Sequence, residues 1–277
     1  MLQVAGIYSS LGGFGLSRWN PPNTEEFKAM ALPLWREALV GMDWLALRAS
    51  SVYRGIGVPH GDESAAVLIP GFLGSDQYLG DMFSWLRRVG YQPYMSAIGR
   101  NAQCPNILTE RLKETVTSAY QDTGRKVHLI GHSLGGSLAR SVAVRQPHLV
   151  ASVTTMASPF RAVRAHPMIL GAAMIVRRRI LSAEDVDSDC YSGLCTCDFF
   201  DSLRRPLPDS IVQAAIYTKS DGVIDWRCCV TGDPETDVEV QGTHVGLVFN
   251  SQVYRQVARR LATAVQRSHG LAEGRLA

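Results

Sequence analysis

Short apolar runs alternate with helix-like stretches along most of this chain. The strand-like runs cover residues 65–70, 91–95, 127–130, 150–156, 211–217 and 238–240. Helix-like stretches cover residues 78–89, 106–121, 134–145 and 248–266. Parallel strands need crossover connections, and these place helices on both faces of a sheet. The alternation therefore predicts an α/β fold with a mostly parallel central sheet flanked by helices.

A separate helical pattern precedes the first strand-like run. Apolar residues between 24 and 49 recur at three- and four-residue spacing, which predicts an amphipathic helix. Pro33 should divide this helix or mark a restart, because proline cannot donate the helical hydrogen bond. We expect residues 1–64 to form a helical extension packed on the core, and we favour this over an interfacial helix.

The alternation stops between Phe160 and Pro208. This stretch holds an apolar nine-residue run, 168–176, followed by three consecutive arginines, 177–179. We interpret residues 160–208 as an irregular lid inserted into a domain that covers residues 65–277. The run is too short to cross a membrane, which takes roughly 20 apolar residues, but the arginines are suited to contact a membrane surface.

Charge and composition narrow the classes of function. The 277 residues include 28 basic and 25 acidic side chains, a net charge of +3. These charges are spread along the chain, which argues against a nucleic-acid partner. The start, MLQVAGIYSSLGGFGLSRW, lacks a charged region, a sustained apolar region and a small-residue cleavage site. We therefore expect no secretory signal and a cytoplasmic protein, with peripheral membrane contact left open.

One short motif carries chemistry. The segment KVHLIGHSLGGSLARSVAVR places Gly131, Ser133 and Gly135 in G-x-S-x-G spacing between a strand-like run and a helical pattern. A serine exposed on such a tight turn needs small neighbours, because the backbone packs closely there. The bare pattern arises by chance about 0.2 times in a chain of this composition. Its position between strand and helix indicates that Ser133 is a nucleophile.

The segment GHSLGG resembles the nucleophile elbow of lipases and esterases in the α/β-hydrolase family, and the resemblance extends over roughly residues 65–266. It implies partners in the order serine, acid, histidine. His244, in the loop QGTHVG, matches the family's base. In KSDGVIDW, Asp221 resembles the family's acid, and we expect Asp225 to cap local structure. His132 adjoins Ser133 and should point elsewhere.

Ester cleavage also needs backbone N–H donors for the oxyanion of the tetrahedral intermediate. The resemblance implies Leu134, directly after the nucleophile, as one donor. The segment PGFLGS resembles the family's oxyanion loop and implies Phe72 as the second donor, with Leu73 as an alternative. No metal and no organic cofactor is required for this chemistry.

These residues predict a serine carboxylic-ester hydrolase that acts through an acyl-enzyme on lipid-like or other acyl esters. Apolar residues of the lid, with Phe199 and Phe200, are suited to bind an acyl chain. An acyltransferase or thioesterase would use the same residues, and a non-catalytic binding protein would keep the same fold. The sequence leaves these alternatives open.

The cysteines form two groups. Cys190, Cys195 and Cys197 fall in the lid, and Cys228 and Cys229 follow the acid loop. A disulfide between the groups, buried free thiols and a zinc site are the alternatives. Zinc is disfavoured because C-x-C and C-C lack the usual C-x-x-C spacing. Cysteine pairing, acyl chain length and oligomeric state are left open by the sequence.

Overall fold

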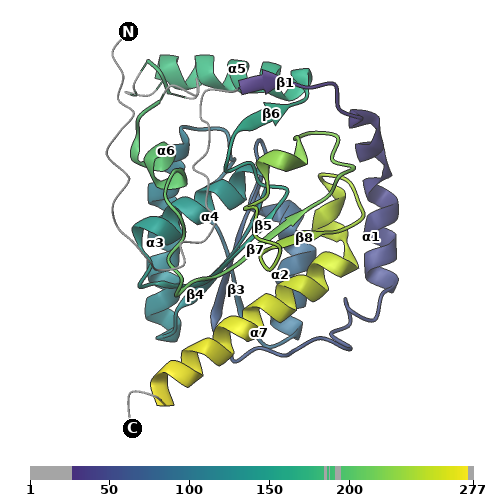
Figure 1. Ribbon diagram of the computed structural model, residues 1–277, viewed down its shortest axis with the longest axis vertical. Coiled ribbons are helices and arrows are strands. Elements are labelled where there is room, and N and C mark those ends of the chain that lie inside the picture. Colours follow the sequence, from purple (N-terminus) through teal and green to yellow (C-terminus); the bar gives the residue numbers. More distant parts are fainter. Residues whose placement is uncertain (1–26, 184–185, 187, 191–194, 274–277) are drawn as a thin grey trace.

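A six-stranded parallel sheet forms the centre of the molecule (Figure 1). The computed structural model describes residues 27–183, 186, 188–190 and 195–273. The strands follow the order β3-β2-β4-β5-β7-β8. Their bounds are β2 (Ala65–Ile69), β3 (Gln92–Met95), β4 (Val127–His132), β5 (Val150–Met156), β7 (Val212–Tyr217) and β8 (Asp237–Glu239). Each strand begins and ends within two residues of its predicted run.

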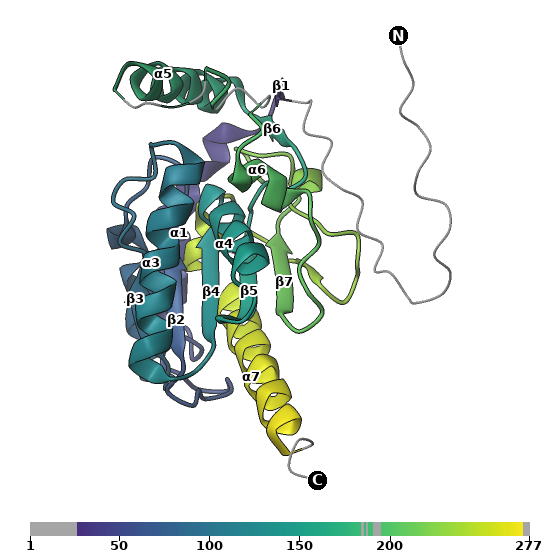
Figure 2. The same ribbon diagram turned by 90° about the vertical axis from the view of Figure 1, so that its left-hand side faces the viewer.

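Helices cover both faces of this sheet, as the alternation predicts. One face packs against α1 (Val40–Ala49), α2 (Gly80–Arg88) and α7 (Ser251–Glu273). The other packs against α3 (Pro105–Thr123), α4 (Leu134–Arg145) and α6 (Asp198–Leu203). Figure 2 shows α3 and α4 in front of the strands. Because side chains alternate along a strand, Ala66 and Leu68 enter one apolar cluster while Val67 and Ile69 enter the other. The described residues also form four short 3₁₀ helices: η1 (Leu34–Leu39), η2 (Asp76–Leu79), η3 (Trp226–Cys228) and η4 (Gly246–Phe249).

The strand order reverses beside β2. Strand β3 pairs with one edge of β2, and β4 pairs with the other. The loops that leave β2 and β4 at their carboxyl ends therefore meet, which is where open parallel sheets bind ligands. The meeting is close: a Cβ on Gly71 would lie 3.0 Å from the Cβ of Ser133.

The prediction of a helix over residues 24–49 is wrong at its N-terminal end. Phe27–Ala29 form a strand, β1, that pairs in parallel with β6 (Val163–Ala165). The helical structure begins directly after Pro33, as η1 and then α1, because the proline interrupts the helical hydrogen bonds. A three-residue strand is too short to show a period of two. Residues 1–26, with which the expected extension begins, lie outside the described residues. The segment from which we expect no secretory signal lies within residues 1–26.

The apolar stripe of this helical segment does not pack on the core as expected. In α1, Leu47 is the buried residue, while Met42 and Leu45 are 61% and 62% exposed. The stripe therefore faces outward over most of its length.

The stretch 160–208, expected to be irregular, contains regular elements. Besides β6 and α6 it holds α5 (Pro167–Ala183), into which the apolar run 168–176 falls. The run is apolar all round and shows no helical period, so sequence reasoning missed the helix. Residues 184–185, 187 and 191–194 of this stretch lie outside the described residues.

A disulfide between the lid and acid-loop cysteines, one of the three alternatives, is not seen. Cys190 Sγ lies 3.2 Å from Cys104 Sγ in one apolar cluster, and Cys228 and Cys229 lie in another. No disulfide is formed, and no group of three or more metal-ligating side chains occurs among the described residues. Within the same residues, every helix is too short or too polar to cross a membrane.

Candidate active site

Ser133 lies at the turn between β4 and α4 in a strained backbone conformation. Its φ is 51°, a value that side-chain-bearing residues rarely adopt and that clusters at functional sites. Two hydrogen bonds hold the turn: Ser133 N–H donates to Met156 O at 2.8 Å, and Gly136 N–H donates to Ser133 O at 3.0 Å. The residue is 7% exposed and lines a cavity.

The glycines around Ser133 are required by close backbone contacts. A Cβ on Gly135 would lie 2.4 Å from the carbonyl oxygens of Ile69 and Pro70. A Cβ on Gly131 would lie 2.4 Å from the amide nitrogen of Gly136. Glycine at these positions therefore lets α4 begin directly against the end of β2.

His244 and Asp221 form a buried pair in the loops that follow β8 and β7. His244 Nδ1 lies 2.7 Å from Asp221 Oδ2. The other carboxylate oxygen accepts from the amides of Val223 and Ile224, at 2.8 and 2.7 Å. Because a carboxylate only accepts, Nδ1 carries the proton and Nε2 is left with its lone pair. His244 can therefore take a proton at Nε2.

The surroundings of His244 tune its basicity in opposite directions. Burial lowers its pKa because the charged form loses water. The charge of Asp221, its hydrogen bond to Nδ1 and the charge of Glu37 act against burial and raise the pKa of His244 above its usual value. The pair therefore favours an imidazole that readily accepts a proton.

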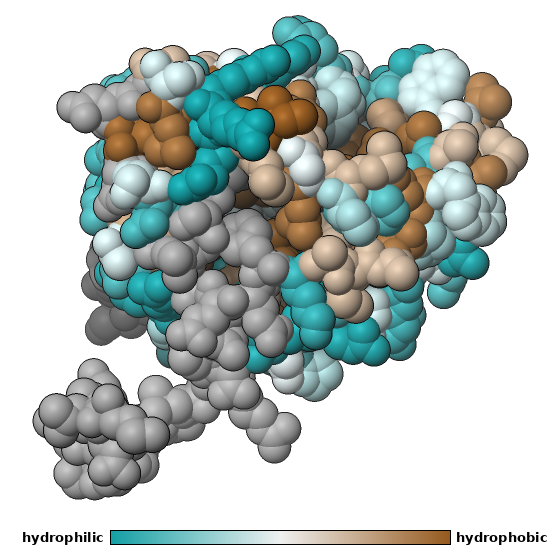
Figure 3. Space-filling model, turned by 90° about the horizontal axis from the view of Figure 1, so that it is seen from above, coloured by the Kyte–Doolittle hydropathy of each residue, from teal (hydrophilic) through white to brown (hydrophobic). Residues whose placement is uncertain are grey.

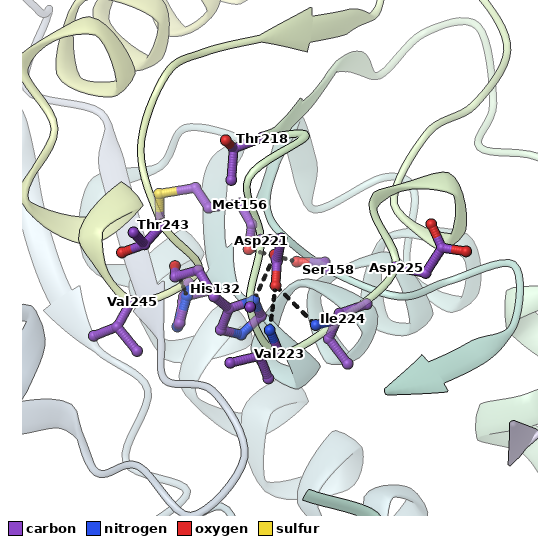
Figure 4. A network of polar contacts seen from close by, with 12 residues as sticks. His132, Met156, Ser158, Thr218, Asp221, Val223, Ile224, Asp225, Thr243 and Val245 are labelled. Atoms are coloured by element: carbon purple, nitrogen blue, oxygen red, sulfur yellow. Dashed lines mark hydrogen bonds and ion pairs between the residues drawn. The ribbon is translucent and has the colours of Figure 1, made fainter. Parts of the chain in front are cut away.

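Asp225 does not join this pair. Its Oδ1 accepts from the backbone N–H of Arg227 at 3.1 Å and so caps η3, as expected. In Figure 4 Asp225 lies on a separate turn, away from Asp221.

His132 does not point elsewhere, contrary to expectation. Its ring lies 4.9 Å from that of His244, and Nε2 donates to the backbone oxygen of His244 at 3.0 Å. Nδ1 then accepts from the hydroxyl of Tyr78 at 2.9 Å. Burial and the neighbouring His244 lower the pKa of His132 to about 3, so the ring is neutral. Adjacent side chains diverge at Cβ, but the loop of His244 lies over the His132 ring.

The loop after β2 contains Phe72 and Leu73, the two alternatives for the second oxyanion donor. The Leu73 amide donates to Asn101 O at 2.8 Å and is therefore engaged. Phe72 lines the cavity beside Ser133, and Leu134 begins α4, where amides have no acceptor within the helix. The loop is fixed by Asn101 Nδ2, which donates to Pro70 O at 2.8 Å.

The cavity in front of Ser133 is largely apolar. It has a volume of about 430 Å³, within the usual range for a small-molecule site. Ser133 and His244 share its wall, although no hydrogen bond joins Ser133 Oγ to His244 among the described residues. Such bonds are often long without a ligand. The apolar wall comes mainly from β6, α5, α6 and the acid loop, through Val163, Ile169, Leu170, Phe199, Phe200 and Ile224.

Sequence reasoning missed three residues that brace this site: Tyr78, Asn101 and Glu37. Tyr78 OH also accepts from the Gly71 amide at 2.7 Å and so ties the loop of Phe72 to His132. None of the three carries a local motif, because each acts on a loop that is distant in the sequence.

Comparisons with known proteins agree with this geometry. The family described as alpha/beta hydrolase fold matches residues 123–181, which include Ser133. A triacylglycerol lipase of Burkholderia plantarii is 32% identical over 143 residues, which cover 48% of this chain and 40% of the lipase. A triacylglycerol lipase of Pseudarthrobacter phenanthrenivorans is 36% identical over 104 residues, which cover 34% and 33%. The chain therefore spans less than half the length of these curated relatives.

Solved structures share the fold. A monoacylglycerol lipase of Paleococcus ferrophilus superposes with a TM-score of 0.50 at 15% identity, covering 75% of this chain and 97% of that one. A putative lipase of Acinetobacter baumannii superposes with a TM-score of 0.50 at 16% identity, covering 87% and 99%. This chain therefore has the α/β-hydrolase fold, and it is similar to distant relatives that are named as triacylglycerol lipases.

Proposed function

We propose that this protein is a serine carboxylic-ester hydrolase that acts through an acyl-enzyme on lipid-like acyl esters. The observation that carries the proposal is the strained turn of Ser133, which lines the same apolar cavity as His244, the residue paired with the buried Asp221. The similarity to triacylglycerol lipases supports an ester as substrate.

The first half of the reaction forms the acyl-enzyme. Ser133 Oγ attacks the acyl carbonyl carbon as His244 Nε2 takes the hydroxyl proton, and Asp221 stabilises the imidazolium that results. The carbonyl electron pair moves onto oxygen, where the amides of Phe72 and Leu134 donate to it. When this electron pair returns from oxygen to form the carbonyl again, the C–O bond to the alcohol breaks and the alcohol leaves with the proton from His244.

The second half releases the acid. Water replaces the alcohol, and His244 Nε2 takes one of its protons while the oxygen attacks the acyl carbon. The ester bond to Ser133 breaks, and the proton returns to Oγ. The protein's own residues supply every group that these steps need.

The substrate class follows from the apolar side of the cavity. Phe199, Phe200 and Leu203 of α6 line it together with Ile169 and Leu170 of α5. A hydrocarbon chain that leaves water for such a wall gains about 0.8 kcal/mol per CH₂. We therefore assign the acyl chain to this side and the alcohol to the open mouth.

The helices α5 and α1 fit a lid and an extension that contact a lipid surface. Met174 and Ile175 of α5 are 60% and 57% exposed, and Met42 and Leu45 of α1 are also exposed. Figure 3 views this end of the molecule and shows apolar side chains interleaved with hydrophilic ones. Exposed apolar patches of this kind mark surfaces that bind partners or membranes. The lid and the extension would then deliver a lipid-like ester to the cavity.

Hydrolysis of p-nitrophenyl acetate, butyrate, octanoate and palmitate tests the proposal. The wild type should cleave these esters, with preference for the longer chains, and Ser133→Ala should reduce kcat by at least about 10⁴. Release of p-nitrophenol, followed by its absorbance, measures both.

Two outcomes would contradict the proposal. Activity that persists in Ser133→Ala would exclude Ser133 as the nucleophile. A wild type that is inert on every ester, but transfers an acyl group to an added alcohol or cleaves an acyl thioester, would favour the acyltransferase or thioesterase alternative.

A further inference from the structure

Glu37 joins two loops of the candidate active site from outside the central sheet. It lies on η1, at the N-terminal side of the described chain, and is half-buried. Its Oε1 accepts from the amide of His244 at 2.9 Å and from that of Gly222 at 3.2 Å. Its Oε2 accepts from the amide of Val245 at 2.9 Å. One carboxylate therefore satisfies three backbone donors, and these belong to the loops that carry His244 and Asp221.

The backbone around Glu37 is packed closely enough to make this contact specific. A Cβ on Gly222, next to Asp221, would lie 2.7 Å from Pro33 O. A Cβ on Gly246 would lie 2.3 Å from Asp43 Oδ2 of α1. The segment formed by η1 and α1 thus lies directly against both loops, with no room for larger residues.

We infer that Glu37 is a positioning residue for the proposed reaction: its carboxylate holds the loops of Asp221 and His244 in register so that Nε2 faces Ser133. The inference rests on the proposed function for its chemistry. Three bonds to a charged acceptor are stronger than bonds to a neutral one, and a misplacement of about 1 Å at a reacting group can cost 10² in rate.

The carboxylate also contributes charge to the site. The titratable groups that face His244 or its loop come from four elements: Asp221 after β7, His132 at the end of β4, Glu37 on η1 and Asp43 on α1. His132 is neutral, and Asp221 contacts the ring directly. Burial raises the pKa of Asp43, and so does the nearby Glu37. Glu37 is therefore, besides Asp221, the carboxylate whose charge raises the pKa of His244.

The effect of the Glu37 charge on the pKa of His244 distinguishes a positioning role from a merely structural one. A residue that only stabilises the fold would change the amount of folded protein and leave the proton affinity of His244 unchanged. Glu37→Gln keeps the size of the side chain but removes its charge and places an N–H donor against backbone donors. Glu37→Asp keeps the charge but shortens the reach. The two variants therefore separate charge from distance.

The experiment compares Glu37→Gln and Glu37→Asp with Glu114→Gln, a control that removes the same charge from an exposed position on α3. Active sites are counted with a fluorophosphonate probe. Values of kcat and KM are measured with p-nitrophenyl butyrate across pH. The ring of His244 is titrated by NMR on protein labelled with ¹⁵N-histidine, which needs no turnover.

We expect kcat per labelled site to fall at least about tenfold in Glu37→Gln with little change in KM. The pKa of His244 should also fall, so the acid limb of the rate profile moves to lower pH. Glu37→Asp should lose rate but keep its acid limb nearer to that of the wild type. Glu114→Gln should match the wild type in each measurement.

Equal rates per labelled site and equal His244 titrations in Glu37→Gln and Glu114→Gln would overturn the inference. Failure of the proposed function would give a different experimental result. In that case the wild type itself would show neither labelling nor hydrolysis, while the NMR titration would still report whether Glu37 acts on His244.

Discussion

The helices α4 and α5 flank the same cavity but are held in place very differently. Nine of the 12 residues of α4 are buried, and the helix begins at Ser133 against the ends of β2 and β4. In α5, of 17 residues, Val176 and Ile180 are buried, and Met174 and Ile175 face outward. The proposed nucleophile therefore lies on a part of the fold with little freedom to move, and the proposed acyl-binding wall lies on a part with few buried contacts.

This difference indicates which part of the candidate site needs accurately fixed positions. Chemistry at Ser133 needs positions accurate to a fraction of an ångström, which dense packing supplies. A wall that accepts acyl chains needs an apolar surface more than an exact shape. Substitutions on the α4 side should therefore have large effects on rate or stability, and similar substitutions on α5 should have small ones.

The largest effect is expected at the buried pair beside α4. Asp221→Asn should lower kcat by roughly 10³ to 10⁴. The amides of Val223 and Ile224 would hold the side-chain oxygen, so the uncharged NH₂ group would face His244 Nδ1 and favour the wrong tautomer. Asp225→Asn is the matched control, since Asp225 caps η3 away from the pair. Esterase kinetics of both variants measure the contrast. Equal losses of kcat in the two variants would contradict the role of Asp221 as the partner of His244.

Two glycines sharpen the comparison through stability. Gly135→Ala should reduce the free energy of unfolding by at least about 3 kcal/mol, because its Cβ would meet two carbonyl oxygens at 2.4 Å. Gly171→Ala on α5 meets nothing within 4 Å and should gain about 0.5 to 1 kcal/mol, because alanine favours a helix. Urea unfolding measures both. A destabilised Gly171→Ala would show that α5 is packed more tightly than its burial indicates.

A third pair tests the anchors of α5 itself. Ile180→Ala should cost about 2 kcal/mol or more, since Ile180 is buried with Val176 and Cys190. Ile175→Ala, one turn away and exposed, should change stability by less than about 0.5 kcal/mol. Thermal unfolding of the two variants measures both changes in stability. Equal costs would contradict the assignment of one face of α5 to the solvent.

The smallest effect concerns pH. His244 must be neutral at Nε2 to take the Ser133 proton, and its pKa is raised above 6.5 by Asp221 and Glu37 against the opposing effect of burial. Activity should therefore rise with pH through an apparent pKa above 6.5 and be low below it. The pH dependence of kcat/KM gives this pKa. An acid limb below pH 6 would mean that burial outweighs the two carboxylates.

The same contrast explains what the sequence could predict. The strands of the central sheet and α4 are predicted within two residues, because buried runs and the G-x-S-x-G turn are local signals. The role of Ser133 follows from the motif, and the roles of Asp221 and His244 follow from the resemblance to lipases and esterases; all three are still proposals. The helix α5 was missed because its run is apolar on every side.

Other parts were missed because they depend on contacts across the chain. Glu37 meets a loop 207 residues away, and no motif marks it. His132 was expected to turn aside, yet the loop of His244 lies over it. Asn101, which accepts from the Leu73 amide, lies on a loop distant in the sequence from the residues that it contacts. Such information exists only once the sheet has brought the loops together.

The most direct test of the central claim is covalent labelling. Intact-protein and peptide mass spectrometry after reaction with a fluorophosphonate should show one adduct, on Ser133, that is absent in Ser133→Ala and forms much more slowly in His244→Ala. A wild type that stays unlabelled, or an adduct on another residue, would contradict the account of Ser133 as a nucleophile activated by His244.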